Sequence, residues 1–243
     1  MPLIFLSEVD LLILQGKKKR KMSENMFSEG NGAGCVIVIG RQFGSGGRKI
    51  GKAVAARLGI GYYDKELLSE AAGSMGFSPD IFVAADEKRP SPFRSLLQGV
   101  YGIADNFHTT TMCGERLYRA QSDVIRKICE MGRCVIVGRT ADYVLREHPG
   151  LVSVFLHAPI ESRARKIVER GDAPTIDQAI DLARKRDHDR EGYYNYFTGR
   201  HWGEASNYHL TLDSSSLSEE KATDIIVAFA SARLDNSQGK KGS

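Results

Sequence analysis

The chain has 243 residues, enough for one large domain or for one domain with a lid. Its net charge of +4 is modest and both signs are spread along the sequence, which argues against a dedicated nucleic-acid-binding protein. No apolar run approaches the roughly 18–20 residues that a membrane-crossing helix needs, so we expect no membrane partner.

The four cysteines predict a reducing environment. Cys35, Cys113, Cys129 and Cys134 do not have the spacing of metal ligands. Cys35 and Cys134 fall in expected core strands, where cysteine behaves as a small hydrophobic residue. We therefore expect a cytoplasmic protein without disulfides.

Residues 1–33 are expected to form a disordered extension. Its apolar stretch, 2–14, precedes the basic run 17–21, whereas a signal peptide has the basic residues first. The basic run is compatible with a nuclear-import or nucleic-acid patch, and with an upstream extension before Met22 or Met26.

The expected folded domain, 34–235, opens with a strand, a glycine-rich turn and a helix. The buried strand 35–39 leads into Gly-Arg-Gln-Phe-Gly-Ser-Gly-Gly-Arg-Lys-Ile-Gly at 40–51, and residues 48–58 have a helical apolar period. Glycines let backbone N–H groups approach an anion, and the start of a helix adds partial positive charge. This order of elements predicts a phosphate site.

The glycine run departs from the P-loop pattern G-x-x-x-x-G-K-[ST]. With the last glycine aligned on Gly46, Arg41 takes the place of the first glycine and Gly47 the place of the lysine. Arg48 then takes the place of the Ser/Thr. The expected nucleotide-binding residues are Gly44, Ser45, Gly46, Gly47, Arg48 and Lys49.

Two nearby cations and one hydroxyl are candidates for the missing groups. We expect Arg48 or Lys49 to supply the charge that the lysine would give to the transferring phosphate, with Lys52 a weaker candidate. Ser45 is the candidate ligand for Mg²⁺. A tight turn without a ligand remains the alternative.

The same glycines also fit a dinucleotide-binding turn. Gly40, Gly44 and Gly46 satisfy G-x-x-x-G-x-G, which resembles the cofactor turn of short-chain dehydrogenases. Those enzymes use a Tyr-x-x-x-Lys pair, and none of the nine tyrosines has a lysine four residues on. Tyr196 with Arg200 is the nearest case, so this alternative lacks its catalytic pair.

Further along the chain, strands and helices alternate, which predicts a parallel sheet covered on both faces. Prolines at 79, 90 and 92 interrupt this order. The remaining expected strands are 60–63, 134–137, 151–156 and 208–212. The remaining expected helices are 65–73, 117–131, 141–146, 159–170, 177–189 and 218–234, with a loop at 191–207 and a disordered tail at 236–243.

Ligands of such sheets bind beyond the carboxyl ends of the strands, and two candidate groups lie there. Asp64 follows the second strand and is a candidate to accept a hydrogen bond from a substrate hydroxyl or to orient an arginine. It is also the expected N-cap of the next helix, and both roles can hold at once. Arg139 follows the third strand and is suited to grip a phosphate. The alternative for Arg139 is a surface arginine paired with an acid such as Asp142.

A highly charged segment, 184–190, precedes the expected loop. It holds four cations and two acids in seven residues with His188 among them. It is either a solvated helix face or part of a mobile lid that brings arginines onto transferring phosphates.

Four segments together resemble the cytidylate kinase-like family of P-loop nucleoside monophosphate kinases. They are 39–51, 62–68, 135–145 and 202–212, and the resemblance spans roughly residues 34–230. It implies an α/β three-layer sandwich with a parallel five-stranded sheet of the P-loop NTPase type, and a small helical lid at about 184–205.

The resemblance also implies roles for single residues. Arg139 would bind the acceptor's phosphate and Asp64 would belong to the acceptor pocket, with Asp142 as a further substrate-binding residue. In the lid, Arg186 and Arg190 would act on the transferring group. Arg184 and Asp187 would bind the substrate.

The implied activity is transfer of the γ-phosphate of ATP, with Mg²⁺, to a small acceptor such as CMP or another nucleoside monophosphate. Cytidylate kinases carry Gly-Lys-[Ser/Thr] in the loop, whereas this chain has Gly47 and Arg48 there. The missing lysine favours the alternative, a kinase-like sensor that binds a nucleotide or another anion without turnover. The retained acceptor and lid residues favour the enzyme.

Overall fold

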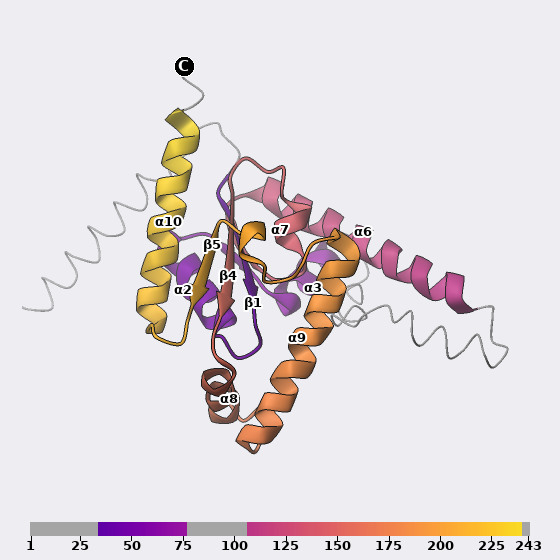
Figure 1. The fold of residues 1–243 in the computed structure, drawn as a ribbon. Helices are drawn as coiled ribbons and strands as arrows, with labels where there is room; N and C mark the ends of the chain where they lie inside the picture. The colour runs from indigo at the N-terminus through magenta and orange to yellow at the C-terminus, as the bar shows by residue number, and fades with distance from the viewer. Residues whose placement is uncertain (1–33, 77–105, 240–243) are drawn as a thin grey trace, which may run out of the picture.

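The structure is a computed structural model that describes residues 34–76 and 106–239. Residues 1–33 and 240–243, for which we predict disorder, lie outside the described residues. The segment 77–105, which contains the prolines at 79, 90 and 92, also lies outside them. The described part is an α/β fold built around one parallel sheet (Figure 1).

The sheet has five strands in the order β2-β3-β1-β4-β5, and every neighbouring pair is parallel, which confirms the predicted sheet. Because the order places β1 between β3 and β4, the carboxyl ends of these three strands lie side by side. The strands are β1 (Val36–Arg41), β2 (Gly61–Tyr63), β3 (Cys134–Val137), β4 (Leu151–His157) and β5 (Leu210–Asp213).

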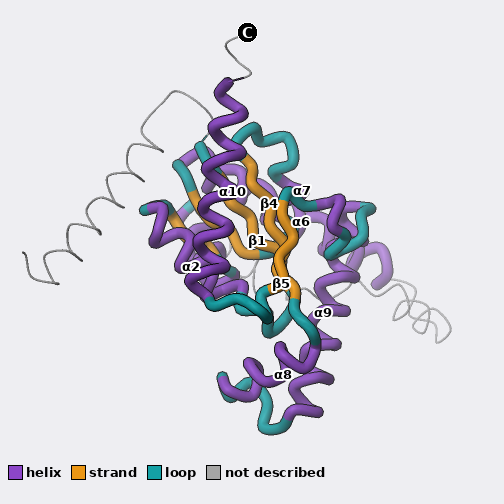
Figure 2. The backbone as a smooth tube through the Cα atoms, turned by 60° about the vertical axis from the view of Figure 1, so that its left-hand side comes forward, coloured by secondary structure: helices purple, strands orange, loops and turns teal. Residues whose placement is uncertain are grey.

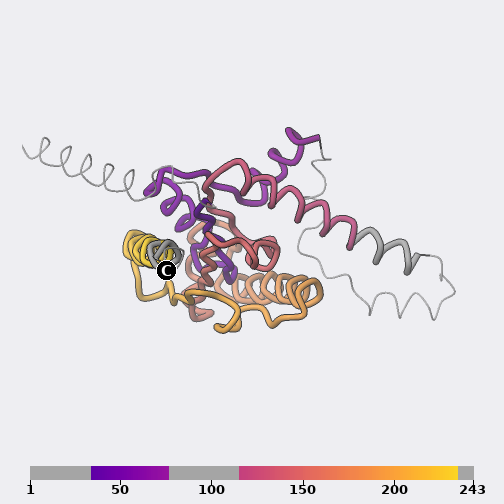
Figure 3. Tube along the Cα trace, turned by 90° about the horizontal axis from the view of Figure 1, so that it is seen from above, coloured from indigo at the N-terminus to yellow at the C-terminus, as the bar shows by residue number. Residues whose placement is uncertain are grey.

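Helices cover both faces of the sheet, as the alternation predicted (Figures 2 and 3). The helices are α2 (Gly47–Leu58), α3 (Lys65–Ser74), α6 (Asn106–Met131), α7 (Ala141–Val144), α8 (Ile160–Glu169), α9 (Ile176–Thr198) and α10 (Glu219–Gly239), with a short 3-10 helix, η1 (Ala205–Asn207).

The strand β1 shows how the sequence builds two cores. Ile37 and Ile39 point to one face and pack with residues of α2 and α10. Val36 and Val38 point to the other face and pack with residues of α3, α6 and α7. All four side chains are fully buried, because successive residues of a strand alternate between faces and this strand is covered on both.

This arrangement creates a crevice at one edge of the sheet. After β1 the chain turns into α2 on one face, and after β3 it turns into α7 on the other. Chains that leave neighbouring parallel strands in opposite directions open a gap at the carboxyl ends, which is where ligands bind in such folds.

Several helix ends follow the sequence signals. Gly59 ends α2 in the left-handed conformation with φ 64°. The Asp64 carboxylate accepts a hydrogen bond from the Leu67 N–H at 3.3 Å and caps α3. The Ser218 hydroxyl accepts from the Lys221 N–H at 3.2 Å and caps α10.

The prediction was wrong about the end of α9, which was placed at residue 189 with a loop at 191–207. The helix continues to Thr198 because its last turns are buried: the Tyr193 hydroxyl donates to Gln121 Oε1 at 2.9 Å, and the Phe197 ring stacks on Tyr118 at 4.4 Å. Tertiary packing thus overrides Gly192, which alone would weaken a helix.

The C-terminal prediction also needs correction. Residues 236–239 were expected in a disordered tail, yet α10 continues to Gly239. The last strand begins at Leu210 rather than at residue 208.

The helices α8 and α9 form a hairpin that projects beyond the carboxyl ends of the strands (Figures 1 and 2). A small core of Ala164, Ile167, Ala179 and Ala183 joins them. The predicted lid, 184–205, therefore contains only one arm of this hairpin, and its movement stays a prediction. No helix in the described ranges is long and apolar enough to cross a membrane.

Candidate functional site

The loop between β1 and α2 adopts the conformation that its glycines permit. Gly44 and Gly46 have φ 85° and 86°, a left-handed region that residues with a side chain rarely adopt. A Cβ atom at Gly44 would lie 2.9 Å from both the Cβ and the carbonyl oxygen of Arg163. The loop is thus shaped by its own backbone and by the close approach of α8.

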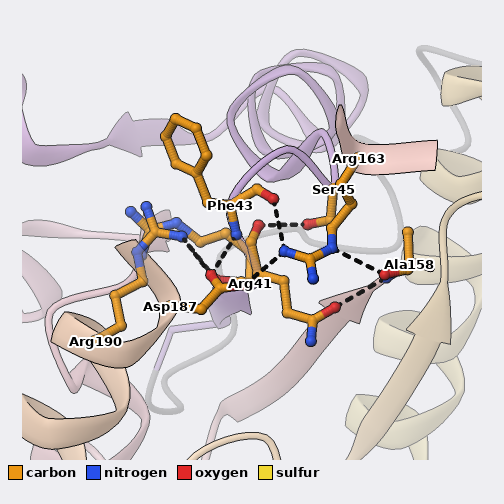
Figure 4. Close-up of polar contacts among 8 residues, drawn as sticks. Arg41, Phe43, Ser45, Ala158, Arg163, Asp187 and Arg190 are labelled. Atoms are coloured by element: carbon orange, nitrogen blue, oxygen red, sulfur yellow. Dashed lines mark hydrogen bonds and ion pairs between the residues drawn. The ribbon is translucent and has the colours of Figure 1, made fainter. Parts of the chain in front are cut away.

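One side of the loop is bonded to the α8–α9 hairpin (Figure 4). The Phe43 N–H donates to Asp187 Oδ1 at 2.7 Å, and the Phe43 carbonyl accepts from Arg163 Nη1 at 3.0 Å. The same guanidinium donates to Asp187 Oδ2 at 2.5 Å and, through Nε, to the Ala158 carbonyl at 2.9 Å. We call this set, Phe43, Ala158, Arg163 and Asp187, the loop–hairpin junction.

The junction is closely held. Side chains of Arg163 and Asp187 are 8% and 14% exposed, so their ion pair is largely removed from water. Burial is the main cause that raises the pKa of Asp187, while the Phe43 N–H and the two arginines Arg163 and Arg190 oppose it. The bonds to the Phe43 N–H and carbonyl thus tie the loop to a largely buried ion pair.

Arg190 connects the junction to the end of β1. Its Nη1 donates to the Arg41 carbonyl at 3.1 Å and lies 3.7 Å from Asp187 Oδ1 (Figure 4). Its guanidinium carbon is 5.5 Å from the centre of the Phe43 ring, within the range of a cation–π contact. Of the predicted lid cations, this one reaches the loop.

On the β3 side, the backbone is strained. Gly138, Arg139 and Thr140 have φ values of 80°, 61° and 51°. A left-handed residue with a side chain costs about 1–3 kcal/mol and such strain concentrates at functional sites. Arg139, although charged, is only 5% exposed.

A pocket of about 30 Å³ lies between these two regions, at the crevice between β1 and β3. Three arginines line it, each from a different part of the chain: Arg41 ends β1, Arg139 follows β3 and Arg190 lies on α9. The full lining is Gly40, Arg41, Gly138, Arg139, Thr140, Asp142, Arg190, Tyr193, Tyr194, Trp202 and Tyr208.

Asp142 is the one carboxyl group in that lining. Its Oδ2 accepts from the Tyr194 hydroxyl at 2.8 Å. Burial is the main cause that raises its pKa, and the Tyr194 hydrogen bond and the Arg200 charge oppose the rise. With three arginines against this one carboxyl group, the pocket wall carries an excess of positive charge, which suits an anionic ligand.

A second pocket, of about 370 Å³, lies beside the first, around the carboxyl half of β4. Its lining includes Gln42 of the loop, His157 and the aromatic rings of Phe155 and Trp202, which meet edge to face at 5.2 Å. Trp202 lines both pockets and is the single tryptophan of the chain. The volume of this second pocket falls in the range of small-molecule sites.

The structure brings only part of the predicted set to the pocket. Arg139, Asp142 and Arg190 line it. Arg184 and Arg186 are exposed on α9 and do not line it, and Asp187 serves the junction. Their predicted roles toward substrate and transferring phosphate stay predictions.

Two of the loop residues that were to replace the missing groups have other partners and the third is exposed, and their predicted roles stay predictions. Arg48 Nη2 lies 2.7 Å from both carboxylate oxygens of Glu66, in an exposed pair, and Lys49 is exposed. The Ser45 hydroxyl is buried and donates to the Gln42 carbonyl at 2.9 Å, so it holds the loop together.

Asp64 is a helix cap, as expected, and also accepts a hydrogen bond from the Tyr62 hydroxyl at 3.2 Å. It does not line the pocket. Its predicted role toward substrate stays a prediction. In the described ranges no three His, Cys, Asp or Glu side chains gather in a way that could hold a metal ion.

Sequence reasoning missed two arginines. Arg41 stands where the P-loop pattern has its first glycine, and that mismatch was a signal that a side chain enters the site there. Arg163 had no such signal, because one arginine among the charges of α8 looks the same whether it faces water or the loop.

Comparisons with known proteins agree with this geometry. The pattern of the cytidylate kinase-like family matches residues 36–216. No curated protein sequence matches the chain.

Among solved structures, an uncharacterized protein from Eubacterium ventriosum is similar, with 25% identity, a TM-score of 0.60, and 81% of this chain and 98% of that one covered. A gluconokinase from Sinorhizobium meliloti has 16% identity, a TM-score of 0.45 and coverage of 88% and 100%. A shikimate kinase from Bacteroides thetaiotaomicron has 12% identity and a TM-score of 0.46, with 83% of this chain and 98% of that one covered. The last two are too distant to bear on function.

The family match includes the loop, the crevice between β1 and β3, the α8–α9 hairpin and β5, and it covers well over half of the residues. The chain therefore belongs to the cytidylate kinase-like family.

Proposed function

We propose that this protein is a phosphotransferase that moves the γ-phosphoryl group of ATP to a small acceptor, with CMP or another nucleoside monophosphate as the first candidate. The observation that carries the proposal is the convergence of Arg41, Arg139 and Arg190 on one pocket beside the loop. Arginine binds phosphate oxygens through a planar fork of donors, and several arginines around one point suit a group that carries several charges.

The position of the pocket supports an acceptor role for Arg139. The pocket lies in the crevice between β1 and β3, and the loop that would hold the donor's phosphates leaves β1 at the same edge. An acceptor phosphate on Arg139 would stand next to a donor on the loop. Such positioning supplies much of the catalysis of phosphoryl transfer.

In the proposed reaction, an oxygen of the acceptor's phosphate forms a bond to the γ-phosphorus. The bond between that phosphorus and the bridging oxygen breaks, and ADP leaves. Arg139 would hold the acceptor, while Arg190, on the α9 arm, would face the charge that is in transit. Arg190 is already anchored to the Arg41 carbonyl, so it needs little ordering.

The described residues offer no metal site of their own, and the Ser45 hydroxyl is used within the loop. We therefore expect Mg²⁺ to enter with the nucleotide, held mainly by phosphate oxygens and water, which is its usual preference. Bound in this way it would neutralise phosphate charge.

A coupled assay of ADP release tests the proposal, with ATP, Mg²⁺ and a panel of nucleoside monophosphates headed by CMP and dCMP. We expect turnover that depends on the acceptor and that falls by about 100-fold or more in Arg139→Ala, since loss of one charge-stabilising group costs about that much. Arg126→Ala, which removes an exposed arginine on α6, is the matched control.

A second candidate function is a non-catalytic nucleotide or anion sensor, which the inward Ser45 hydroxyl and the absence of the P-loop lysine favour. Binding of ATP without turnover across the whole panel would support the sensor and contradict the kinase. Trp202 offers the binding signal, because it lines both pockets.

A further inference from the structure

The phosphate loop of this chain lacks a lysine at the start of its helix, and the structure accounts for the glycine found there. Gly47 has a right-handed helical backbone that any residue could adopt, so its glycine is not demanded by φ. A Cβ atom at Gly47 would lie 2.8 Å from Arg41 Cγ and 2.9 Å from Arg41 Cβ. The side chain of Arg41 therefore lies across the position where a P-loop has its lysine.

The far end of Arg41 reaches the crevice. A Cβ atom at Gly138 would overlap with the Arg41 guanidinium, which therefore lies directly on the backbone that follows β3. Arg41 lines the same pocket as Arg139 and Arg190. Two glycines thus make room for one arginine, Gly47 for its stem and Gly138 for its head.

The positive charge of Arg41 also acts on Tyr62, which lies close to α2. The pKa of Tyr62 is raised chiefly by burial and by the neighbouring Asp64, and the positive charges of Arg48 and Arg41 oppose that rise. A Cβ atom at Gly51, in the second turn of α2, would lie 3.2 Å from Tyr62 Cε2, so the ring lies close to this helix. Together with the close approach of its stem to Gly47, this is consistent with Arg41 lying beside the start of α2, where backbone N–H groups have no partner within the helix.

Relative to the P-loop pattern, the small and the large, cationic residue have exchanged places between positions 41 and 47. The pattern has glycine first and lysine at the helix start, whereas this chain has Arg41 first and Gly47 at the helix start. One cation is kept in both cases, and only the end of the loop that supplies it differs. The backbone of Arg41 is held by Arg190 at 3.1 Å, which fixes the origin of the side chain.

We propose that Arg41 is the phosphate-binding cation of this loop, in place of the lysine, and that its ligand is the polyphosphate of a nucleoside triphosphate. The proposal rests on the proposed function for the identity of the donor. A guanidinium in this place binds two phosphate oxygens at once, where an ammonium acts as a point charge. The loop is thus complete in charge although its sequence pattern is broken.

Calorimetric titration with ATP and with inorganic tripolyphosphate tests this, on the full chain and without any acceptor. We expect Arg41→Met to weaken the binding of both ligands by about tenfold or more, and Arg41→Lys, which keeps a charge on the same stem, to retain part of it. Arg57→Met is the matched control: Arg57 lies in the last turn of α2 and pairs with Asp224 at 2.5 Å, so its loss leaves binding unchanged.

A double variant tests the exchange itself. Gly47→Lys alone should weaken binding, because its side chain meets Arg41. Arg41→Gly together with Gly47→Lys restores the usual order, and we expect it to bind tripolyphosphate more tightly than Arg41→Gly alone, a non-additive result. Thermal unfolding of each variant identifies any that fail to fold. If the double variant fails, the affinities of Arg41→Met and Arg41→Lys test the proposal.

The proposal is overturned if wild-type protein does not bind tripolyphosphate or ATP, or if Arg41→Met binds them as wild type does. Failure of the proposed function looks different: binding that depends on Arg41 with no ADP release for any acceptor leaves Arg41 as the phosphate-binding residue of a sensor. Turnover that survives Arg41→Met unchanged leaves the kinase and refutes the role of Arg41.

Discussion

Two arginines of this protein are almost equally buried and differ in what surrounds them. Arg163 is 7% exposed and binds the Asp187 carboxylate and two carbonyl oxygens, so its donors are spent on structure. Arg139 is 5% exposed, has a left-handed backbone and lines a pocket with two further arginines. The acceptors around Arg163 hold it within the fold, and the gathering of Arg139 with two further cations on the wall of a cavity suits an anionic ligand.

The loop thus has two sides with different surroundings. The loop–hairpin junction holds Phe43 in place, and the crevice between β1 and β3 offers charge to a ligand. Variants of the junction should therefore change stability first, and variants of the crevice should change binding and turnover first.

The largest expected effect on stability is that of Asp187→Ala, which leaves the Arg163 guanidinium buried without its carboxylate. Removing one partner of a buried ion pair costs about 3–5 kcal/mol. Denaturant unfolding measures this loss. Asp187→Asn is the matched control, since its amide oxygen still accepts from the Phe43 N–H, and we expect a smaller loss. Equal stability of Asp187→Ala and wild type would show that the junction does not hold the loop.

Gly44→Ala should have the next largest effect. Its methyl group would stand 2.9 Å from Arg163 and the backbone would be held at φ 85°. The left-handed conformation alone costs about 1–2 kcal/mol, and the collision adds to it. Denaturant unfolding checks the loss, with Gly171→Ala as control: Gly171 has φ 76° but open space around it, so that variant isolates the collision.

Asp142→Asn probes the crevice through pH. The folded pKa of Asp142 is raised by burial above its ordinary value of 3.8, so the folded state binds this proton more tightly than the unfolded chain. Its contribution stabilises the fold below pH 3.8 and is lost as the pH rises through the folded pKa. Asparagine does not titrate and can still accept from Tyr194.

The melting temperature of Asp142→Asn relative to wild type should therefore rise as the pH increases from below 3.8 through the folded pKa, and then stay level. A difference in melting temperature that does not vary with pH would mean that burial does not raise the pKa of Asp142.

How far the sequence predicted this molecule depends on the range of the signal. The five parallel strands and the glycine turn follow from local patterns, because alternation and glycine conformations are properties of short segments. The end of α9 was missed because rings from Tyr118 and Phe197, far apart in sequence, stack on one another. Arg139 and Arg190 were identified from strand ends and the lid resemblance, and the structure brings them together.

The proposed role of Arg41 had no comparable local signal, and the predicted roles of Arg48 and Lys49 stay predictions. Sequence adjacency favoured Arg48 and Lys49, but the first points to Glu66. Arg41 lies six residues before Gly47 and reaches across it only because the loop folds back on β1. A contact of this kind depends on the turn between the two residues.

The smallest expected effect is that of Arg48→Ala, which tests the helix side of the loop. Arg48 and Glu66 are 54% and 61% exposed, and exposed ion pairs contribute about 0–1 kcal/mol. We expect little change in unfolding, and a loss in tripolyphosphate affinity well below that of Arg41→Met, as measured by the same calorimetric titration. Lys49→Ala is the parallel variant. A loss of tripolyphosphate affinity in either variant as large as that of Arg41→Met would mean that Arg48 or Lys49, at the start of α2, supplies the phosphate-binding charge.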